Sequence, residues 1–593
     1  MNWDLASYFP GIGDEAYRTY VEALERDVES LRAAVSVEHR AGEAGATVAC
    51  LAEQLIRLED LGSRLRHAGS YTGCLVASDV RDAAAQAARA RLAAVSSGLE
   101  KVDAAVSVRV AALPEGALGE LRERLEGAEG AVLRMRDVGA RRMDAEREAL
   151  AADLLRDGMH AWGRLYQRLS GGLAFPLRRP DGPEESVPMS QRRTLMEDED
   201  PAIRRAAFEG GNEAWAAQAT VFAAALNAIT GSRLTLVRER GFGHVLDLAC
   251  HDSRITRRTL DAMMEAVEEG GALARRYLAL KAKASGREHL GFFEFTSPLP
   301  GAANARVSWE QARERVCAAL GQAMPSLGEY AEMAFERRWI EAEPRAGKSP
   351  GGFCTSSPVS GESRIFMTFR GTAGDVQTLA HELGHAYHNH VMRDLRPLAR
   401  RYPMTLAESA STFAEQAYTE QVLEDASTPE AERLAVLNTR LGKAAAFLLD
   451  IPVRYRFELA LHEAREGGEL GVDELGDLME REQRAVFGDI LGPDGVDRWF
   501  WASKLHYFIT GVSFYNFPYT FGYLFSMSLW ERFAGTGRAG EEGFIAFLRA
   551  TGGRTVEDVV SGQLGVDLGE VAFWRGCLAP VRRDLEALER LLG

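Results

Sequence analysis

The chain of 593 residues is 46% hydrophobic and 26% charged, and its formal net charge is −16. This balance is typical of a folded protein with a large core and argues against intrinsic disorder. An acidic chain is a poor match for a phosphate backbone, so no nucleic-acid partner is expected.

The cysteines and the first residues bear on the compartment. Six cysteines are scattered singly without a Cys-Xaa-Xaa-Cys pair, so neither a disulfide framework nor a zinc ribbon is indicated. Residues 1–10 carry Asp4 and lack a basic stretch followed by an apolar one, so no signal peptide is expected. No run of about 18 apolar residues indicates a membrane span. The sequence therefore predicts a cytoplasmic protein without a membrane partner.

The first part of the chain, from Asp14 to Leu169, is predicted to be a helical bundle. It is rich in Ala, Leu, Arg and Glu with apolar residues at helical spacing, and proline is nearly absent. Prolines and glycines then cluster between residues 170 and 190, which is typical of a connecting segment or a short hairpin. We therefore predict two domains, residues 1–185 and residues 186–593.

Helical patterning resumes near Asp200, with loops expected at residues 240–255 and 285–305. Residues 363–370 are short and β-prone and form the best strand candidate. A helix is expected from Asp375 to about Val391, and another from Thr405 to Leu423.

The first of these helices carries the pattern His-Glu-Xaa-Xaa-His. His381 and His385 are four residues apart, about 400° of rotation and about 6 Å of rise, so both imidazoles leave one helix face. Two such rings can reach one tetrahedral zinc, and Glu382 can take a proton from a metal-activated water. The pattern predicts one Zn²⁺ per chain with Glu382 as the general base.

Catalytic zinc usually has three protein ligands, so a third is expected from a later helix. A stripe of polar residues follows helical spacing on an otherwise apolar helix: Glu408, Ser411, Thr412 and Glu415. Such a stripe suggests a buried polar site, although a solvated helix face is the alternative. We predict Glu408 as the third ligand and Glu415 as a group that orients a ligand histidine. His388 and His390 are expected to be neighbouring or core histidines.

Residues 375–386 resemble the zinc helix of the M3 metallopeptidases, and residues 408–415 resemble the helix that carries their third ligand. The likeness extends to residues 238–242 and 513–523, and the N-terminal part is similar to the oligoendopeptidase F type. The resemblance implies a mainly α, multi-helical, two-lobed and clam-like fold with a deep substrate channel and a small β-sheet next to the zinc helix. Asp375 is expected in the shell of residues behind the ligands.

The same resemblance implies a zinc endopeptidase that hydrolyses short unfolded oligopeptides. In such a site the substrate backbone pairs with the strand before the zinc helix, for which the residues are Ile365, Phe366, Met367 and Thr368. A segment with tyrosines and a histidine would stabilise the oxyanion. Its candidates are Tyr515, Tyr519, Tyr523 and His506. Ser513 stands where many relatives have a histidine, and aromatic core packing is the alternative for any one tyrosine.

Two other functions fit the same motif. A zinc carboxypeptidase on a related helical scaffold would need a basic residue that holds the terminal carboxylate of its substrate. A catalytically silent peptide-binding homologue would have no use for Glu382 as a base. The sequence predicts neither an oligomeric state nor a cleavage-site preference.

Overall fold

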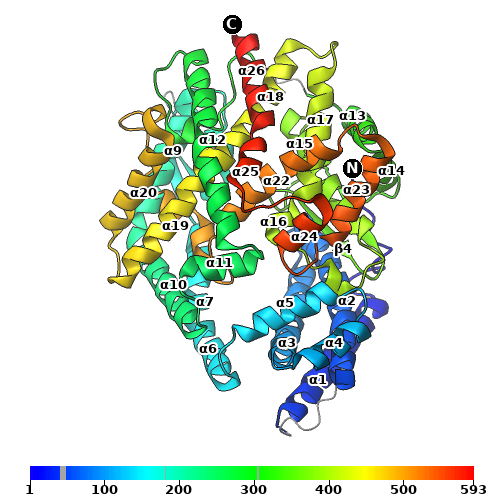
Figure 1. The fold of residues 1–593 in the computed structure, drawn as a ribbon. Coiled ribbons are helices and arrows are strands. Elements are labelled where there is room, and N and C mark those ends of the chain that lie inside the picture. The colour runs from blue at the N-terminus through cyan, green and yellow to red at the C-terminus, as the bar shows by residue number, and fades with distance from the viewer. Residues whose placement is uncertain (41–47, 180–181, 303–305) are drawn as a thin grey trace. The chain divides into compact units, whose positions relative to one another are not determined.

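Helices make up most of the chain in the computed structural model, which describes residues 1–40, 48–179, 182–302 and 306–593 (Figure 1). Parts of three predictions lie outside these residues: 41–47 of the bundle, 180–181 of the linker and 303–305 of the second loop. The chain divides into two units, each assembled from three stretches. Unit 1 contains Met1–Arg142, Asn304–Asp425 and Ser526–Val566; unit 2 contains Met143–Ala303, Ala426–Phe525 and Asp567–Gly593.

Unit 1 combines five N-terminal helices with the helices that follow residue 304. These are α1 (Glu15–Arg40), α2 (Val48–Ser78), α3 (Ala83–Ala111), α4 (Glu115–Arg124), α5 (Glu129–Ala140), α13 (Trp309–Ala323), α14 (Pro325–Glu336), α15 (Ala373–Val391), α16 (Met404–Ala407), α17 (Ser409–Glu424), α23 (Gly537–Ala550) and α24 (Val556–Leu564). The helical spacing of apolar residues predicted for the first part of the chain is seen at the start of α2, where Leu51, Leu55, Leu58 and Leu61 are all buried.

A three-stranded sheet in unit 1 has the order β3 (Ile340–Glu341), β5 (Glu362–Phe366), β4 (Phe353–Ser357). β3 pairs with β5 in parallel, and β4 pairs with β5 antiparallel. α15 packs against both β4 and β5. The predicted mainly α fold with a small sheet beside the His-Glu-Xaa-Xaa-His helix is confirmed, whereas the two-lobed channel stays a prediction.

Unit 2 is also helical. It contains α6 (Ala145–Asp157), α7 (Met159–Gly171), α8 (Arg192–Met196), α9 (Pro201–Ala217), α10 (Ala219–Glu239), α11 (Val245–Ser253), α12 (Arg257–Ala284), α18 (Glu430–Ala445), a π-helical turn (Ala446–Asp450), α19 (Ile451–Glu466), α20 (Val472–Phe487), α21 (Phe500–Ser503), α25 (Val571–Gly576) and α26 (Ala579–Leu592). α22 (Phe517–Phe533) contributes residues to both units.

The segment rich in proline and glycine forms a hairpin of β1 (Ala174–Arg178) and β2 (Glu184–Pro188). A short hairpin is one of the two predicted alternatives, the other being a connecting segment. The predicted domain boundary between residues 185 and 186 falls inside β2, and the contacts instead divide the chain after Arg142. The division into domains 1–185 and 186–593 therefore does not follow the compact units.

Three predicted elements need correction. The loop expected at 240–255 contains α11, which begins at Val245 with the His244 side chain accepting a hydrogen bond from Leu246 N–H. The helix expected from Thr405 is interrupted at Glu408, between α16 and α17. The strand expected at 363–370 ends at Phe366.

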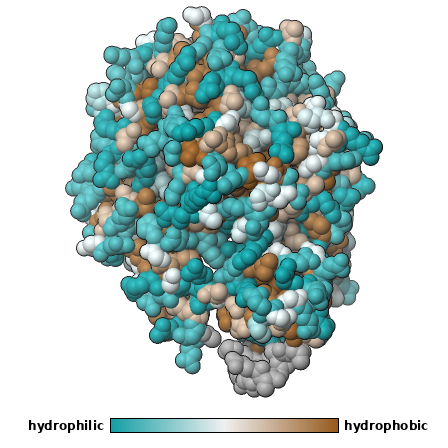
Figure 2. All heavy atoms as spheres, in the orientation of Figure 1, coloured by the Kyte–Doolittle hydropathy of each residue, from teal (hydrophilic) through white to brown (hydrophobic). Residues whose placement is uncertain are grey.

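Of the described helices, α10 alone is long and apolar enough to cross a bilayer by length and composition, and half of its apolar window is buried within the protein. It packs against α7 and α19 of its own unit. The surface drawn in Figure 2 is mainly hydrophilic with apolar residues scattered over it. Large exposed apolar side chains are spread over several elements, among them Ile56, Leu154 and Val359.

Candidate metal centre

Two helices of unit 1, α15 and α17, lie side by side (Figure 1). α15 carries the two predicted histidine ligands, and the predicted ligand Glu408 comes directly before α17. A Cβ atom built on Gly384 would lie 2.3 Å from the carbonyl oxygen of Ala410, so the helices touch through backbone at this point. Thr372 and Asp375 form a capping box that fixes the first turn of α15. The sequence thus sets both the start of the helix and its closest approach to α17.

The structure brings together three ligand atoms from His381, His385 and Glu408. The two histidine Nε2 atoms are 3.1 Å apart, and Glu408 Oε2 lies 3.4 Å from His381 Nε2 and 3.5 Å from His385 Nε2. Ligands bound at about 2.0–2.1 Å to a tetrahedral zinc are about 3.3 Å from one another. The three atoms therefore fit a single zinc-sized ion.

Residues that do not face the metal position contact the ligand residues and fix their orientation. Glu415 Oε1 lies 2.6 Å from His381 Nδ1, so the ring nitrogen that points away from the cluster has an anionic partner. Ser411 Oγ donates to Glu408 Oε2 at 2.7 Å. The Ser526 hydroxyl on α22 donates to the backbone carbonyl of Glu408 at 2.9 Å, which holds the break between α16 and α17.

The electrostatics of the cluster favour a cation. Burial opposes the charge on His381, but the contact with Glu415 outweighs it and raises the pKa of His381 to about 9. Burial and then the charge of His381 lower the pKa of His385 to about 4. Burial also opposes ionisation of Glu408, yet the two histidines hold its pKa below the usual value. Two carboxylates thus surround the imidazoles and can neutralise a divalent ion.

Glu382 is the buried neighbour of this cluster. Its carboxylate is 5% exposed, and burial raises its pKa to about 7. Its Oε2 atom has no hydrogen-bond partner among the described residues, which is unusual for a buried carboxylate oxygen. Its Oε1 atom lies near Gly352 at the start of β4, 3.3 Å from where a Cβ would stand.

The strand predicted to pair with substrate occupies a different place in the sheet. β5 lies between β3 and β4, Ile365, Phe366 and Met367 are buried, and Ile365 and Met367 donate backbone hydrogen bonds toward β3. Thr368 follows the end of the strand. The prediction of substrate pairing at Ile365–Thr368 is wrong because this strand has no free edge.

β4 is the edge strand beside Glu382, and the sequence pattern does not distinguish it. Ile365 of β5 directs its N–H toward β3, so it makes no backbone hydrogen bond with Cys354, the residue opposite it on β4. The backbone groups of Cys354, and of Ser356 two residues later, therefore point to the outer edge of β4. The Ser70 hydroxyl of α2 donates to the Ser356 carbonyl at 3.0 Å, which covers the far end of that edge. The nearby Gly351-Gly352 pair is the signal that could have indicated a strand start.

Other predicted residues lie apart from the ligands. Asp375 Oδ2 accepts from the backbone N–H groups of Arg370 and Thr372, so it caps α15 and does not contact a ligand histidine. His388 is fully buried, and its Nε2 lies 2.9 Å from Thr551 Oγ1. The His390 ring packs on Tyr330. Neither histidine joins the ligand cluster.

The predicted oxyanion residues belong to unit 2. His506, Tyr515 and Tyr519 form one aromatic group, with ring centroids 5.2–6.4 Å apart. Tyr523, on α22, stacks on Phe447 at 4.5 Å. Phe447 belongs to the π-helical turn, an element frequent at functional sites.

Glu458, a buried carboxylate that no sequence motif marks, holds the residues on both sides of Tyr515. Glu458 is 2% exposed and accepts from Phe514 N–H and from Asn516 Nδ2, both at 2.8 Å. Arg233, 3.8 Å from Glu458, donates to the carbonyls of Ile509 and Val512. The contact with Glu458 counters the cost of the positive φ of Phe514, 51°.

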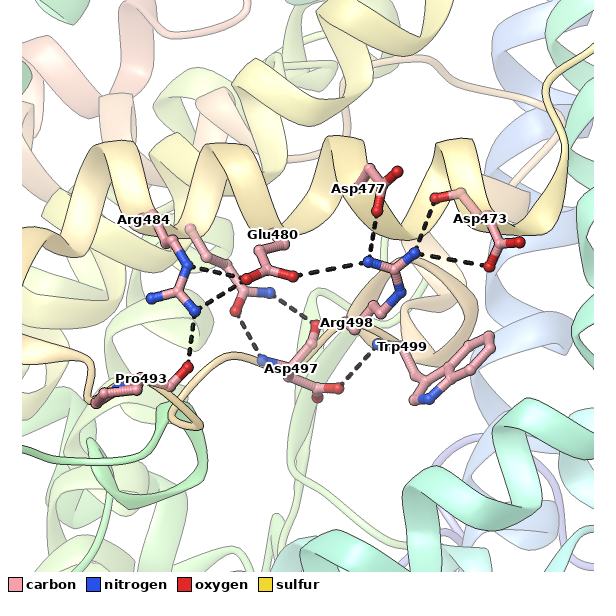
Figure 3. Close-up of polar contacts among 9 residues, drawn as sticks. Asp473, Asp477, Glu480, Arg484, Pro493, Asp497, Arg498 and Trp499 are labelled. Carbon is pink, nitrogen blue, oxygen red and sulfur yellow. Dashed lines mark hydrogen bonds and ion pairs between the residues drawn. The ribbon is translucent and has the colours of Figure 1, made fainter.

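The segment before Phe514, at residues 493–498, is fixed to α20 (Figure 3). Gln483 exchanges two hydrogen bonds with the backbone of Asp497, at 2.8 and 2.9 Å. Arg498 contacts Asp477 at 2.5 Å, and Arg484 donates to the Pro493 carbonyl at 2.7 Å. The stretch from residue 493 to 516 is therefore anchored at both ends within unit 2.

Comparison with solved structures gives the class of fold. Oligoendopeptidase-F from Enterococcus faecium superposes with a TM-score of 0.70 at 20% identity, covering 97% of this chain and 98% of that one. PZ peptidase A superposes with a TM-score of 0.73 at 16% identity, covering 96% and 97%. The chain therefore has the helical fold of the oligoendopeptidase F type.

Sequence comparison shows which peptidases the chain resembles. Residues 326–575 match peptidase family M3. An oligoendopeptidase F homologue of Lactococcus lactis is 24% identical over 67% of this chain and 66% of its own length. Oligopeptidase PepF of Bacillus subtilis is 22% identical over 71% of this chain and 62% of its own length. Both matches therefore span less than two thirds of the relative's length. The part of the chain from residue 326 to 575 is therefore similar to the M3 peptidases.

Proposed function

We propose that the chain is a zinc-dependent endopeptidase that cuts internal bonds of short unfolded peptides. The observation that carries this proposal is the convergence of two histidines and a carboxylate beside the buried, unpartnered oxygen of Glu382. The names of the matched relatives, oligoendopeptidase F and oligopeptidase, support the same reaction and substrate class.

One zinc ion would be held by His381 Nε2, His385 Nε2 and Glu408 Oε2. When bound, such an ion acts as a Lewis acid and lowers the pKa of water. Glu415 fixes the orientation of His381 through its Nδ1 atom. A set of two nitrogens and one oxygen favours zinc among the common divalent ions.

Glu382 moves the proton. Its Oε2 atom accepts a proton from the attacking water and then returns it to the amide nitrogen of the leaving group. The raised pKa of Glu382, about 7, suits a group that must both take and give a proton near neutral pH.

The outer edge of β4 would bind the substrate backbone, starting at Gly352 beside Glu382. Tyr515, Tyr519, Tyr523 and His506 stay the candidate donors to the oxyanion, where charge develops only in the transition state. A cytoplasmic location remains part of the proposal.

The test is a Glu382→Gln variant, with product analysis by mass spectrometry. We expect the variant to keep one zinc per chain and to lose turnover, and the wild type to cut peptides with an amidated C-terminus and to stop when chelated. A carboxypeptidase would leave the amidated peptides intact, and a silent binding protein would cut nothing while still binding peptides. Substantial activity in the zinc-loaded variant would show that Glu382 is not the general base.

A further inference from the structure

At the far end of β4, unit 1 has a small pocket rich in arginine. Its volume is about 30 Å³, which has room for about two water-sized groups, such as the two oxygens of a carboxylate. Arg66 of α2, Arg393 at the end of α15 and Arg400 line it together with Ser356 and Asn389.

The guanidinium groups of this pocket have no carboxylate partner among the described residues. Arg393 and Arg400 donate to the backbone carbonyls of His390, Leu395 and Arg393. Arg66 makes no ion pair or hydrogen bond with the part of the chain that the structure describes. Burial and the nearby charge of Arg66 lower the pKa of Arg400. An anion would relieve this repulsion.

The acidic groups around the pocket already have partners. Glu362, which lines it, contacts Arg364 at 2.9 Å and accepts from Ser7 Oγ at 2.6 Å. Two further carboxylates influence Arg400, and each is bound elsewhere: Glu59 by Arg396 and Asp394 by Arg549. The net charge left to the pocket is positive.

The pocket lies in line with the proposed substrate path. Asn389 is one turn beyond His385 on α15 and donates to its carbonyl at 3.0 Å. Along β4, the step from Phe353 to Ser357 covers about 13 Å, the length of about four extended residues. Glu382 stands at one end of this edge and Arg66 at the other.

We propose that the Arg66 pocket is a specificity site for an acidic side chain of the peptide. A peptide paired antiparallel to the open part of this edge, at Cys354 and Gly352, runs toward Gly352, and the residues before the paired part lie past the Ser356 carbonyl, which Ser70 occupies, on the side of the Arg66 pocket. The residue at the pocket therefore lies about four positions on the N-terminal side of the cleaved bond. This inference rests on the proposed function and adds a substrate class to it, peptides with Asp or Glu at that position.

The test uses end-blocked peptides that carry a single Glu, moved through the sequence, with Gln at the same positions as the reference. We expect the wild type to favour Glu over Gln by about 5-fold in kcat/KM at about the fourth position before the bond, the effect of one partly exposed ion pair. Arg66→Gln should abolish this preference, and Arg89→Gln, which removes an exposed charge from α3, should keep it. Added salt should weaken the preference.

Three results would overturn the proposal: a Glu preference that survives Arg66→Gln, a preference on the C-terminal side of the bond, and selection only for a free terminal carboxylate. Absence of any cleavage by the wild type would count against the proposed function instead. In that case the same Glu and Gln peptides, labelled for fluorescence anisotropy, test the pocket directly. Equal affinities for both, or a preference that Arg66→Gln leaves unchanged, would refute it.

Discussion

Gly384 of α15 faces the backbone of Ala410 on α17 so closely that the hydrogen of its Cα is the largest substituent that fits. Gly384 lies inside the His-Glu-Xaa-Xaa-His pattern, and Ala410 lies two residues after Glu408. The spacing between the two helices, and so the spacing of the three ligand atoms, depends on this contact.

Gly384→Ala should therefore weaken metal binding and the fold together. The added methyl group would push α15 from α17 and cost about 1–3 kcal/mol of unfolding free energy, as overpacking does. Zinc titration and chemical unfolding measure the two effects. Gly374→Ala is the matched control, because its Cβ would meet only Thr372 Oγ1 at 3.8 Å. That variant should be neutral or more stable by up to about 1 kcal/mol. Normal zinc affinity in Gly384→Ala would contradict the prediction.

Glu415→Gln should lower zinc affinity by about 10- to 100-fold, the usual cost of losing a carboxylate behind a ligand histidine. The amide can still contact His381 Nδ1 but no longer supplies a negative charge. Competition with a chelator gives the affinity. Glu424→Gln, at the exposed end of the same helix, should change nothing. Equal affinities in both variants would show that Glu415 is not needed.

Glu458→Gln should reduce kcat by about 100-fold if Tyr515 acts in the reaction, since small misplacements of a reacting group have effects of that size. The oxygen of the new amide would still accept a hydrogen bond from Phe514 N–H. Its NH2 group would face the NH2 group of Asn516, so two donors would oppose each other. Asn516→Asp in the same chain restores a donor–acceptor pair and should recover most of the loss.

Asp584→Asn serves as the control for that series, because Asp584 pairs with Arg440 at 2.8 Å in another buried contact of unit 2. It should destabilise the fold and leave kcat near that of the wild type. If the double variant is no better than Glu458→Gln, the positioning role of Glu458 is refuted.

His388 should make unit 1 sensitive to acid. Burial lowers its pKa to about 3, whereas an unfolded histidine titrates near 6.5. Its contribution is complete above pH 6.5 and is lost as pH falls toward 3, because the unfolded chain then binds the extra proton. At pH 5 the loss amounts to about 2 kcal/mol.

The contribution of His388 is measured as the difference in unfolding free energy between pH 7.5 and pH 5. Chelator-treated protein is used, so that loss of metal at low pH does not add to the difference. His388→Gln should reduce the difference in unfolding free energy between the two pH values, and the same change at the partly exposed His289 should not. An unchanged pH dependence in His388→Gln would mean that other groups cause the acid sensitivity.

The sequence predicts the parts of this site that follow from local geometry. Spacing along one helix puts His381 and His385 together, and the polar stripe indicates Glu408 and Glu415. Pairing of strands is not local: β5 is the more apolar strand because it is central, so the β-prone pattern selected the strand that cannot bind substrate. Asp375 was misassigned for a related reason, since helix caps and ligand-orienting carboxylates have the same residue type. Glu458 lies in an ordinary helical segment, and only the fold brings Phe514 and Asn516 to it.

The order in which unit 1 is assembled from the chain limits when its metal centre can form during synthesis. All three ligands are present once residue 408 has been translated, but the hydroxyl of Ser526 that holds the Glu408 backbone follows more than a hundred residues later. A nascent chain that stops between these points carries every ligand without the hydroxyl that holds the backbone of Glu408. We therefore expect zinc uptake to become tight only after α22 has left the ribosome, and C-terminally truncated chains to bind the ion weakly.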